Sequence, residues 1–143
     1  MIIVPFSGGL GNQLFQYAFS CSLSRQNPSH KIYYTDYLIR RNPAHNGYEL
    51  AYLFGITLSS TPYVERLTRF SRKVLLFPRF KPIVSFLLSL ARIYVREESR
   101  YCSFDVSFMT ARKGVNIYIG YWPKALYFQS IADEIVRKFT FDM

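Results

Sequence analysis

Three glycines within four residues, directly after a short apolar run, set the strongest constraint on how this chain can fold. The run from Met1 to Phe6 predicts a buried strand, and Gln13 to about Gln26 predicts a helix that is apolar nearly all round. Between them stand Gly8, Gly9 and Gly11. Glycine tolerates a positive φ and lets the backbone approach a ligand, while the first N–H groups of a helix attract phosphate. The pattern therefore predicts either a tight connection or an anion-binding site.

The spacing of these glycines differs from that of the two common nucleotide motifs. Leu14 stands where a Rossmann motif has its third glycine, and no Gly-Lys-Ser/Thr follows as it would in a P-loop. Asn12 can cap the helix, but the carboxamides of Asn12 and Gln13 can also bind ribose, sugar or diphosphate oxygens. We interpret the stretch as a substrate site for another phosphate-bearing ligand, formed by Gly8, Gly9, Leu10, Gly11, Asn12 and Gln13.

Two further strands and a final helix are expected along the chain. Lys31 to Asp36 predicts a second strand that pairs parallel to the first, because a helix crosses between them. Val115 to Trp122 predicts a third strand, and Pro123 is expected in the first turn of a helix whose apolar face comprises Phe128, Ile131, Ala132, Ile135 and Phe139. Residues 1–143 are therefore expected to form one α/β domain, a parallel sheet flanked by helices.

Four residues outside the glycine stretch are candidates for an acceptor site or cleft. Asp36 ends the second predicted strand, at the sheet edge where ligands of open α/β proteins gather, although an aspartate there can equally cap a turn. His45 can contact a sugar hydroxyl or bond within its own loop. Tyr121 and Trp122 can stack on a sugar face or pack in the core. Both interpretations stay open for each residue.

The segment 61–100 is strongly basic. It holds nine Lys and Arg against three acidic residues, in a chain of net charge +9. Val64 to Phe77 and Ile83 to Val95 are expected to form two helices, and neither reaches the roughly 20 apolar residues that span a bilayer. Three interpretations remain: a helical insertion with a solvated basic face, contact with an anionic membrane, or a rim for nucleic acid. Nucleic-acid motifs are otherwise missing from the sequence, so no nucleic-acid partner is expected.

The cysteines bear on the compartment. Cys21 and Cys102 are far apart and have no metal-ligand spacing, so no metal is expected. Cys21 falls within the first predicted helix and is expected to be a buried free thiol, as in a reducing compartment. The N-terminal apolar run is too short for a signal peptide and has no basic lead. The expected location is the cytoplasm, with peripheral contact on the inner membrane face as the alternative for the basic segment.

The glycine stretch also resembles a known signature. Gly-Gly-Leu-Gly-Asn-Gln-Leu-Phe-Gln-Tyr-Ala at 8–18 resembles the opening motif of the family 11 glycosyltransferases, the α-1,2-fucosyltransferases that use GDP-fucose. His-Asn-Gly-Tyr-Glu-Leu at 45–50, continuing to Leu-Phe-Gly-Ile at 53–56, is similar to a second block of that family. A third block is matched by Gly-Tyr-Trp at 120–122, Tyr-Phe at 127–128 and Arg-Lys-Phe-Thr-Phe at 137–141, although Pro123 replaces the usual glutamine. The blocks follow the family's order.

This resemblance implies the N-terminal, Rossmann-like half of a GT-B glycosyltransferase, in which two such domains face each other across a cleft. The implied reaction is inverting transfer of L-fucose from GDP-fucose to the 2-hydroxyl of a galactoside, in glycan or surface polysaccharide synthesis, without cofactor or metal. The family's His-x-Arg-Arg-x-Asp-Tyr segment is not found here, since Arg40 and Arg41 stand within Leu-Ile-Arg-Arg-Asn-Pro. The C-terminal nucleotide-sugar domain is therefore expected to be absent, and residues 1–143 are expected to hold no catalytic residue and to be inactive alone.

Two other functions stay open. The chain can be a non-catalytic domain whose glycine loop binds a phosphate or a sugar, or a peripheral protein that contacts a membrane surface through its basic segment. The expected partners under the resemblance are a nucleotide sugar and a galactoside acceptor. The sequence predicts no oligomeric state.

Overall fold

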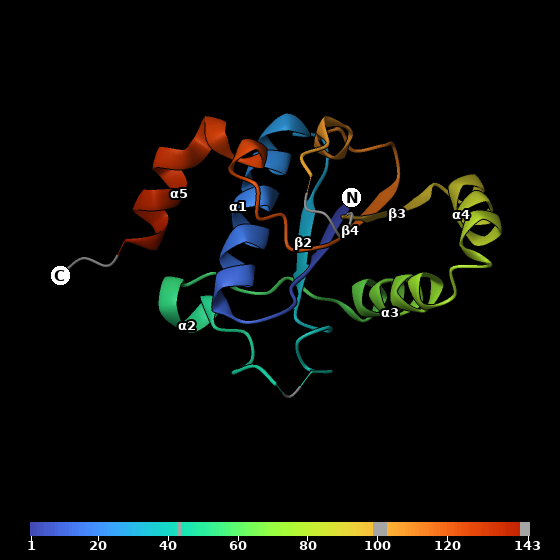
Figure 1. Cartoon of the computed structure of the whole chain (residues 1–143), viewed down its shortest axis with the longest axis horizontal. Coiled ribbons are helices and arrows are strands. Elements are labelled where there is room, and N and C mark those ends of the chain that lie inside the picture. The colour runs from blue at the N-terminus through green and yellow to red at the C-terminus, as the bar shows by residue number, and fades with distance from the viewer. Residues whose placement is uncertain (43, 99–102, 141–143) are drawn as a thin grey trace.

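Four parallel strands form one sheet in the order β2-β1-β4-β3, in a computed structural model that describes residues 1–42, 44–98 and 103–140 (Figure 1). The strands are β1 (Ile2–Pro5), β2 (Ile32–Thr35), β3 (Ile93–Glu97) and β4 (Val115–Ile119). The helices are α1 (Leu10–Gln26), α2 (Leu50–Phe54), α3 (Pro62–Leu76), α4 (Lys81–Leu90) and α5 (Ala132–Phe139). The expected α/β class with a parallel sheet flanked by helices is confirmed.

Helices cover both faces of the sheet, which explains why every residue of β1 is buried. Ile2 and Val4 point to the face that α1 covers, and Ile3 points to the face that α3 covers. α1, α2 and α5 lie on one side of the strands in Figure 1, and α3 and α4 lie on the other. The β1–β2 register pairs Ile2 with Ile32 and Pro5 with Thr35, so both strands end at the same sheet edge.

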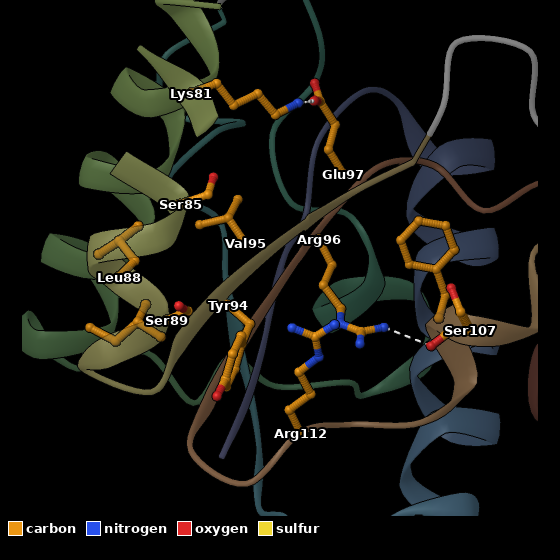
Figure 2. Close-up of a pocket in the computed structure, with 12 residues that line it drawn as sticks. Lys81, Ser85, Leu88, Ser89, Tyr94, Val95, Arg96, Glu97, Ser107 and Arg112 are labelled. Atoms are coloured by element: carbon orange, nitrogen blue, oxygen red, sulfur yellow. Dashed lines mark hydrogen bonds and ion pairs between the residues drawn. The ribbon is translucent and has the colours of Figure 1, made fainter. Parts of the chain in front are cut away.

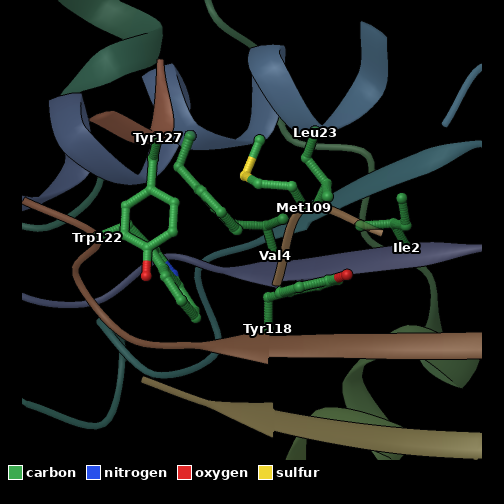
Figure 3. Packing of buried hydrophobic residues seen from close by; sticks show 8 residues of the cluster. Ile2, Val4, Leu23, Met109, Tyr118, Trp122 and Tyr127 are labelled. Carbon is green, nitrogen blue, oxygen red and sulfur yellow. The ribbon is translucent and has the colours of Figure 1, made fainter. Parts of the chain in front are cut away.

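Aromatic rings dominate the core between α1 and the sheet (Figure 3). Phe19 of α1 stacks on Trp122 with ring centroids 4.3 Å apart, and Tyr127 meets both rings edge-on. Tyr118 of β4 closes the cluster with its ring edge against Phe19. All four side chains are at most 1% exposed. The core therefore joins α1 to β4 and to the segment that follows it.

α1 begins earlier than the sequence predicts. The helix starts at Leu10 rather than near Gln13, and Gly9 is its N-cap residue without a side-chain cap. The prediction that Asn12 can cap the helix is therefore wrong, because Asn12 already lies in the first turn. The predicted helix end at about Gln26 is confirmed, and Asn27 follows as the C-cap. The short helix α2 ends at Phe54, and Gly55 follows as its C-cap in the left-handed conformation with φ 64°.

The predicted helix from Ile83 to Val95 is wrong in its second half. α4 ends at Leu90, Arg92 adopts a left-handed φ of 56°, and Ile93–Glu97 then forms β3 beside β4. The backbone amide of Val115 donates to the Arg92 carbonyl at 2.9 Å, which fixes the start of β3 against the start of β4. Tertiary pairing thus outweighs the helical pattern, and the segment 61–100 is not a purely helical insertion because it supplies an edge strand.

The last predicted strand and helix also need correction. β4 ends at Ile119, so Tyr121 and Trp122 lie in the loop after it. Two 3₁₀ turns, at Ala125–Tyr127 and Gln129–Ile131, precede α5, so Pro123 does not begin a helix. The Tyr127 side chain is buried in the core, and its hydroxyl accepts a hydrogen bond from the backbone N–H of Asp105. These contacts fix the segment before α5 in a conformation other than a continuous helix. The predicted apolar face nevertheless packs on α1 through Ile131 and Ile135.

No helix among the described residues is long and apolar enough to cross a membrane, and this includes both helices of the basic segment.

Cys21 lies half-buried in α1 as a free cysteine, so it is less buried than the sequence suggests. Burial raises the pKa of its thiol above the ordinary 9.0, and the nearby Glu134 carboxylate acts in the same direction, while a hydrogen bond from Tyr17 opposes them.

Because the pKa of the thiol is raised, we expect the alkylation rate of Cys21 by iodoacetamide to keep rising as the pH passes 9.0. Mass spectrometry of the Cys21 peptide would measure it, and the urea-unfolded chain is the control. A rate that levels off below pH 9.0 in the folded chain would contradict this assignment.

Candidate functional site

A hollow of about 230 Å³ lies at the sheet edge where the parallel strands end. Its lining comes from the loops after three strands and from α3: Ser7, Gly8, Leu38, Asn42, Arg72, Leu75, Ile119 and Tyr121. Ligands of open α/β sheets bind outside the carboxyl ends of the strands. Pockets for whole small molecules usually measure roughly 300–1,000 Å³, so this hollow suits a fragment such as a phosphate or diphosphate.

Gln13 joins two of the loops at this edge. Its Nε2 donates to the Gly8 carbonyl at 3.1 Å and to the Gly47 carbonyl at 2.9 Å, and its Oε1 accepts the Glu49 amide at 3.0 Å. The side chain is completely buried. Both donor hydrogens are thus used within the protein, so Gln13 positions the glycine loop and does not itself present its amide to a ligand.

Gln16, one turn further along α1, joins two other loops. Its Nε2 donates to Ser7 Oγ at 2.9 Å and to the Gly120 carbonyl at 2.7 Å, and its Oε1 accepts the Ser7 amide at 3.1 Å. This side chain is also completely buried. Because residues three apart on a helix share one face, Gln13 and Gln16 together hold the loops after β1 and β4 and the segment before α2.

Of the glycine stretch, Gly8 lines the hollow, and Gly9, Gly11 and Asn12 follow it at the start of α1. Gly8 has a φ of +76°, which favours glycine, and a β-carbon there would come within 2.4 Å of Asn12 Nδ2 and displace that side chain. Gly11 has open space around its α-carbon. The first intrahelical bond recorded at this end runs from the Gln13 amide to the Gly9 carbonyl. The N–H groups of Leu10, Gly11 and Asn12 therefore precede the hydrogen-bonded turn and are available to an anion.

Arginines surround the same edge. Arg72 of α3 lines the hollow and is exposed. Beside it, the buried ring of Tyr37 carries two guanidinium groups, with Arg41 at 5.3 Å and Arg69 at 5.8 Å from the ring centroid. Arg40 differs from these, because it pairs with Asp36 and Glu65. The positive potential of Arg41, Arg69 and Arg72 adds to that of the α1 N-terminus and favours an anionic ligand.

The other two polar candidates take separate places. Asp36 accepts Arg40 Nε at 2.9 Å, and its carbonyl accepts the Arg40 amide at 3.0 Å, so it stabilises the turn after β2. His45 is exposed, and its Nδ1 would lie 3.5 Å from a β-carbon at Gly9. His45 is therefore the one of these two that the fold brings to the glycine loop.

The aromatic candidates also separate. Tyr121 is 44% exposed and lines the hollow, whereas Trp122 is completely buried against Phe19 and belongs to the core rather than to a cleft. Trp122 has a left-handed φ of 56°, which is strained for a bulky residue. Glu98 Oε2 accepts the amides of Tyr121 and Trp122, each at 2.8 Å, and so holds this turn in place.

A larger hollow of about 400 Å³ runs along the edge strand β3 but is a weaker candidate (Figure 2). None of the residues that the sequence analysis predicts for a substrate, acceptor or cleft site lines this hollow. Its cations are already engaged: Lys81 pairs with Glu97, Arg96 donates to the Ser107 carbonyl, and Arg112 lies over the Tyr94 ring. No group of three or more His, Cys, Asp or Glu residues in the described part of the chain could hold a metal ion.

Sequence reasoning missed Arg72, Gln16 and Glu98. Gln16 lies in the glycine-led motif, and a buried amide on the same face as Gln13 is a signal that could have identified it. Arg72 is one of nine similar cations in its segment, and only the packing of α3 on the sheet separates it from them. Glu98 depends on β3, which the sequence pattern did not predict.

No protein-family model, curated protein or solved structure matches this chain.

Proposed function

We propose that this chain is the Rossmann-like, N-terminal domain of a GT-B α-1,2-fucosyltransferase that transfers L-fucose from GDP-fucose to the 2-hydroxyl of a galactoside. In this proposal the hollow at the carboxyl edge of the sheet binds the donor diphosphate from the N-terminal side of the cleft. The observation that carries it is the glycine loop, because Gly8 lines one hollow together with Arg72 and α1 begins two residues later. The motif at 8–18 supplies the link to a nucleotide sugar.

The proposed chemistry needs an anion site. The acceptor oxygen attacks C1 of fucose on the face opposite the diphosphate, and the bond between C1 and the diphosphate oxygen breaks. Negative charge then grows on the departing GDP, so fixed donors at the diphosphate lower the barrier. This chain offers three kinds of donor for that purpose. They are the backbone amides in the first turn of α1 (Leu10, Gly11 and Asn12), the Asn12 side chain and the Arg72 guanidinium.

The general base that takes the proton of the acceptor hydroxyl remains unassigned. Two carboxylates that follow strands have structural roles, since Asp36 binds Arg40 and one oxygen of Glu98 accepts two backbone amides. These roles favour a second candidate function, a non-catalytic domain in which the same hollow binds a phosphorylated ligand without turnover. Binding of GDP is common to both functions, and transfer of fucose separates them.

Transfer of labelled fucose from GDP-fucose to lactose, measured with the whole protein that contains this chain, tests the proposal. We expect Asn12→Ala to reduce kcat/KM by roughly tenfold, the effect of losing one hydrogen bond to a charged group. Gln26→Ala is the matched control, because it removes an exposed amide from the other end of α1, outside the hollow, and it is expected to have a smaller effect. Unchanged kinetics in Asn12→Ala with an intact fold would remove the loop from the site, and absence of transfer by the whole protein alongside GDP binding would favour the non-catalytic domain.

A further inference from the structure

A large apolar surface covers the outside of α3, α4 and the turn between them. Its members are between 45% and 69% exposed, and we call them the α3–α4 patch: Phe70, Leu76, Phe77, Phe80, Ile83, Phe86, Leu87 and Leu90. None of the ten residues of α4, all of which the structure describes, is buried. Folded monomers rarely expose a continuous apolar surface of this kind unless a partner covers it.

The patch has helical periodicity on α4. Ile83, Phe86, Leu87 and Leu90 recur at intervals of three, one and three residues, which places them on one face. Figure 2 shows Ser85, Leu88 and Ser89 on the side of α4 that faces β3. The helix therefore turns its more polar side to the protein and its apolar side to the outside, the reverse of an ordinary surface helix.

α3 combines apolar and cationic residues on its outer face. The buried residues of α3 face the sheet, and on the opposite face Arg66, Phe70, Lys73 and Phe77 follow one another at intervals of four, three and four. The patch is continuous with that of α4 through a hollow of about 210 Å³, which is lined by Phe70, Lys73, Val74, Phe77, Phe80 and Val84. Cations thus lie among the aromatic rings of the patch.

We propose that the α3–α4 patch binds an anionic membrane surface, with its apolar side chains in the headgroup boundary and Arg66, Lys73 and Arg79 on the lipid phosphates and carboxylates. Amphipathic helices with aromatic and aliphatic residues flanked by Lys and Arg bind such interfaces. This inference is independent of the proposed fucosyl transfer. It places the protein at the membrane through a surface contact, which needs no spanning helix in the part of the chain that the structure describes.

The charges argue against a second copy of the chain as the partner. In a symmetric dimer through this patch, a surface that carries the cations Arg66, Lys73 and Arg79 would face an identical cationic surface, because such an interface uses the same patch on both subunits. Within α3 and the following turn, Glu65 is the only acid, and it is already paired with Arg40. Anionic lipid headgroups supply the opposite charge that this surface requires.

Co-sedimentation of residues 1–143 with vesicles tests the proposal. We expect binding to equimolar phosphatidylcholine and phosphatidylserine, and much weaker binding to phosphatidylcholine alone. Arg66→Gln with Lys73→Gln should weaken the partition coefficient about 25-fold, since each cation contributes about fivefold at an anionic surface. Phe86→Ser with Leu87→Ser should weaken it by about tenfold or more. Matched controls are Lys113→Gln with Lys138→Gln, and Tyr52→Ser, which change exposed residues outside the patch.

All of these side chains are exposed, so circular dichroism and thermal unfolding are expected to match wild type. Wild-type chain that stays in solution with anionic vesicles would overturn the proposal. So would equal loss of binding in the patch variants and their controls. A dimer in light scattering that Phe86→Ser with Leu87→Ser converts to a monomer, without vesicle binding by wild type, would assign the patch to a second copy instead.

Discussion

Replacing Gln16 by alanine is expected to lower the free energy of unfolding by about 2–5 kcal/mol, because a fully buried amide is lost and two partly buried backbone groups lose their partner, at roughly 1–3 kcal/mol each. The Ser7 amide and the Gly120 carbonyl both lose the hydrogen bonds that Gln16 supplies. The loops after β1 and β4 are then no longer joined at the edge of the hollow. Urea denaturation followed by circular dichroism would measure the change.

Two control variants test whether the loss of stability comes from the buried amide of Gln16 in particular. Gln26→Ala removes an exposed side chain from the last position of the same helix, and it should change stability by no more than about 0.5 kcal/mol. Gln16→Glu places a carboxylate, which cannot donate at neutral pH, against the Gly120 carbonyl. It should be as destabilising as alanine, and near wild-type stability of Gln16→Glu would contradict the role assigned to the amide.

Replacing Arg72 by alanine is expected to weaken GDP binding roughly tenfold or more, the effect of losing a hydrogen bond between charged groups worth about 1.5–3 kcal/mol. Arg72 is the cation that lines the hollow beside Gly8. Its side chain is exposed, so the fold should keep its stability. The dissociation constant would be taken from an NMR titration of residues 1–143 with GDP.

The comparison variant is Arg66→Ala on the opposite face of α3. It removes the same charge from the same helix but from a position that does not line the hollow. Arg66→Ala should leave GDP binding within about twofold of wild type, because an exposed charge at a distance is screened by salt. Arg72→Lys keeps the charge without the planar fork and should lie between wild type and Arg72→Ala. If Arg66→Ala and Arg72→Ala weakened GDP binding equally, the effect of Arg72 would come from the net charge of the protein, and the proposed contact in the hollow would be wrong.

The parts of the fold that the sequence predicts are those set by local pattern. The apolar run before the glycines became β1, the nearly all-apolar helix became α1 between sheet and outer helices, and Val115 to Ile119 became β4. Each of these elements lies in the interior, so its apolar residues recur regularly along the sequence and the element can be predicted. Ile93 to Val95 are wrongly predicted to be helical because their apolar residues extend the pattern of the preceding helix, and only pairing with β4 makes Ile93–Glu97 a strand.

The candidate site divides in the same way. The glycine loop is visible in the sequence because a strand, a turn and a helix follow one another along the chain. The sequence does not reveal whether Gln13 and Trp122 face a ligand or the interior. That depends on their contacts with Gly47, Glu49 and Phe19, which lie elsewhere in the chain. Both proved to be internal. Arg72 comes to the site only through the packing of α3, so no local pattern singles it out.

The most direct test of the nucleotide-sugar proposal is the amide NMR spectrum of isotope-labelled residues 1–143 during titration with GDP. We expect the amides of Gly8 to Asn12 and of Tyr121 to shift together, because Gly8 and Tyr121 line the hollow proposed for the diphosphate and residues 9–12 lead from it into the first turn of α1. Titration with guanosine, which lacks the diphosphate, should leave them unchanged. Shifts confined to residues along β3 and α4, or none at all with GDP, would contradict the proposed site.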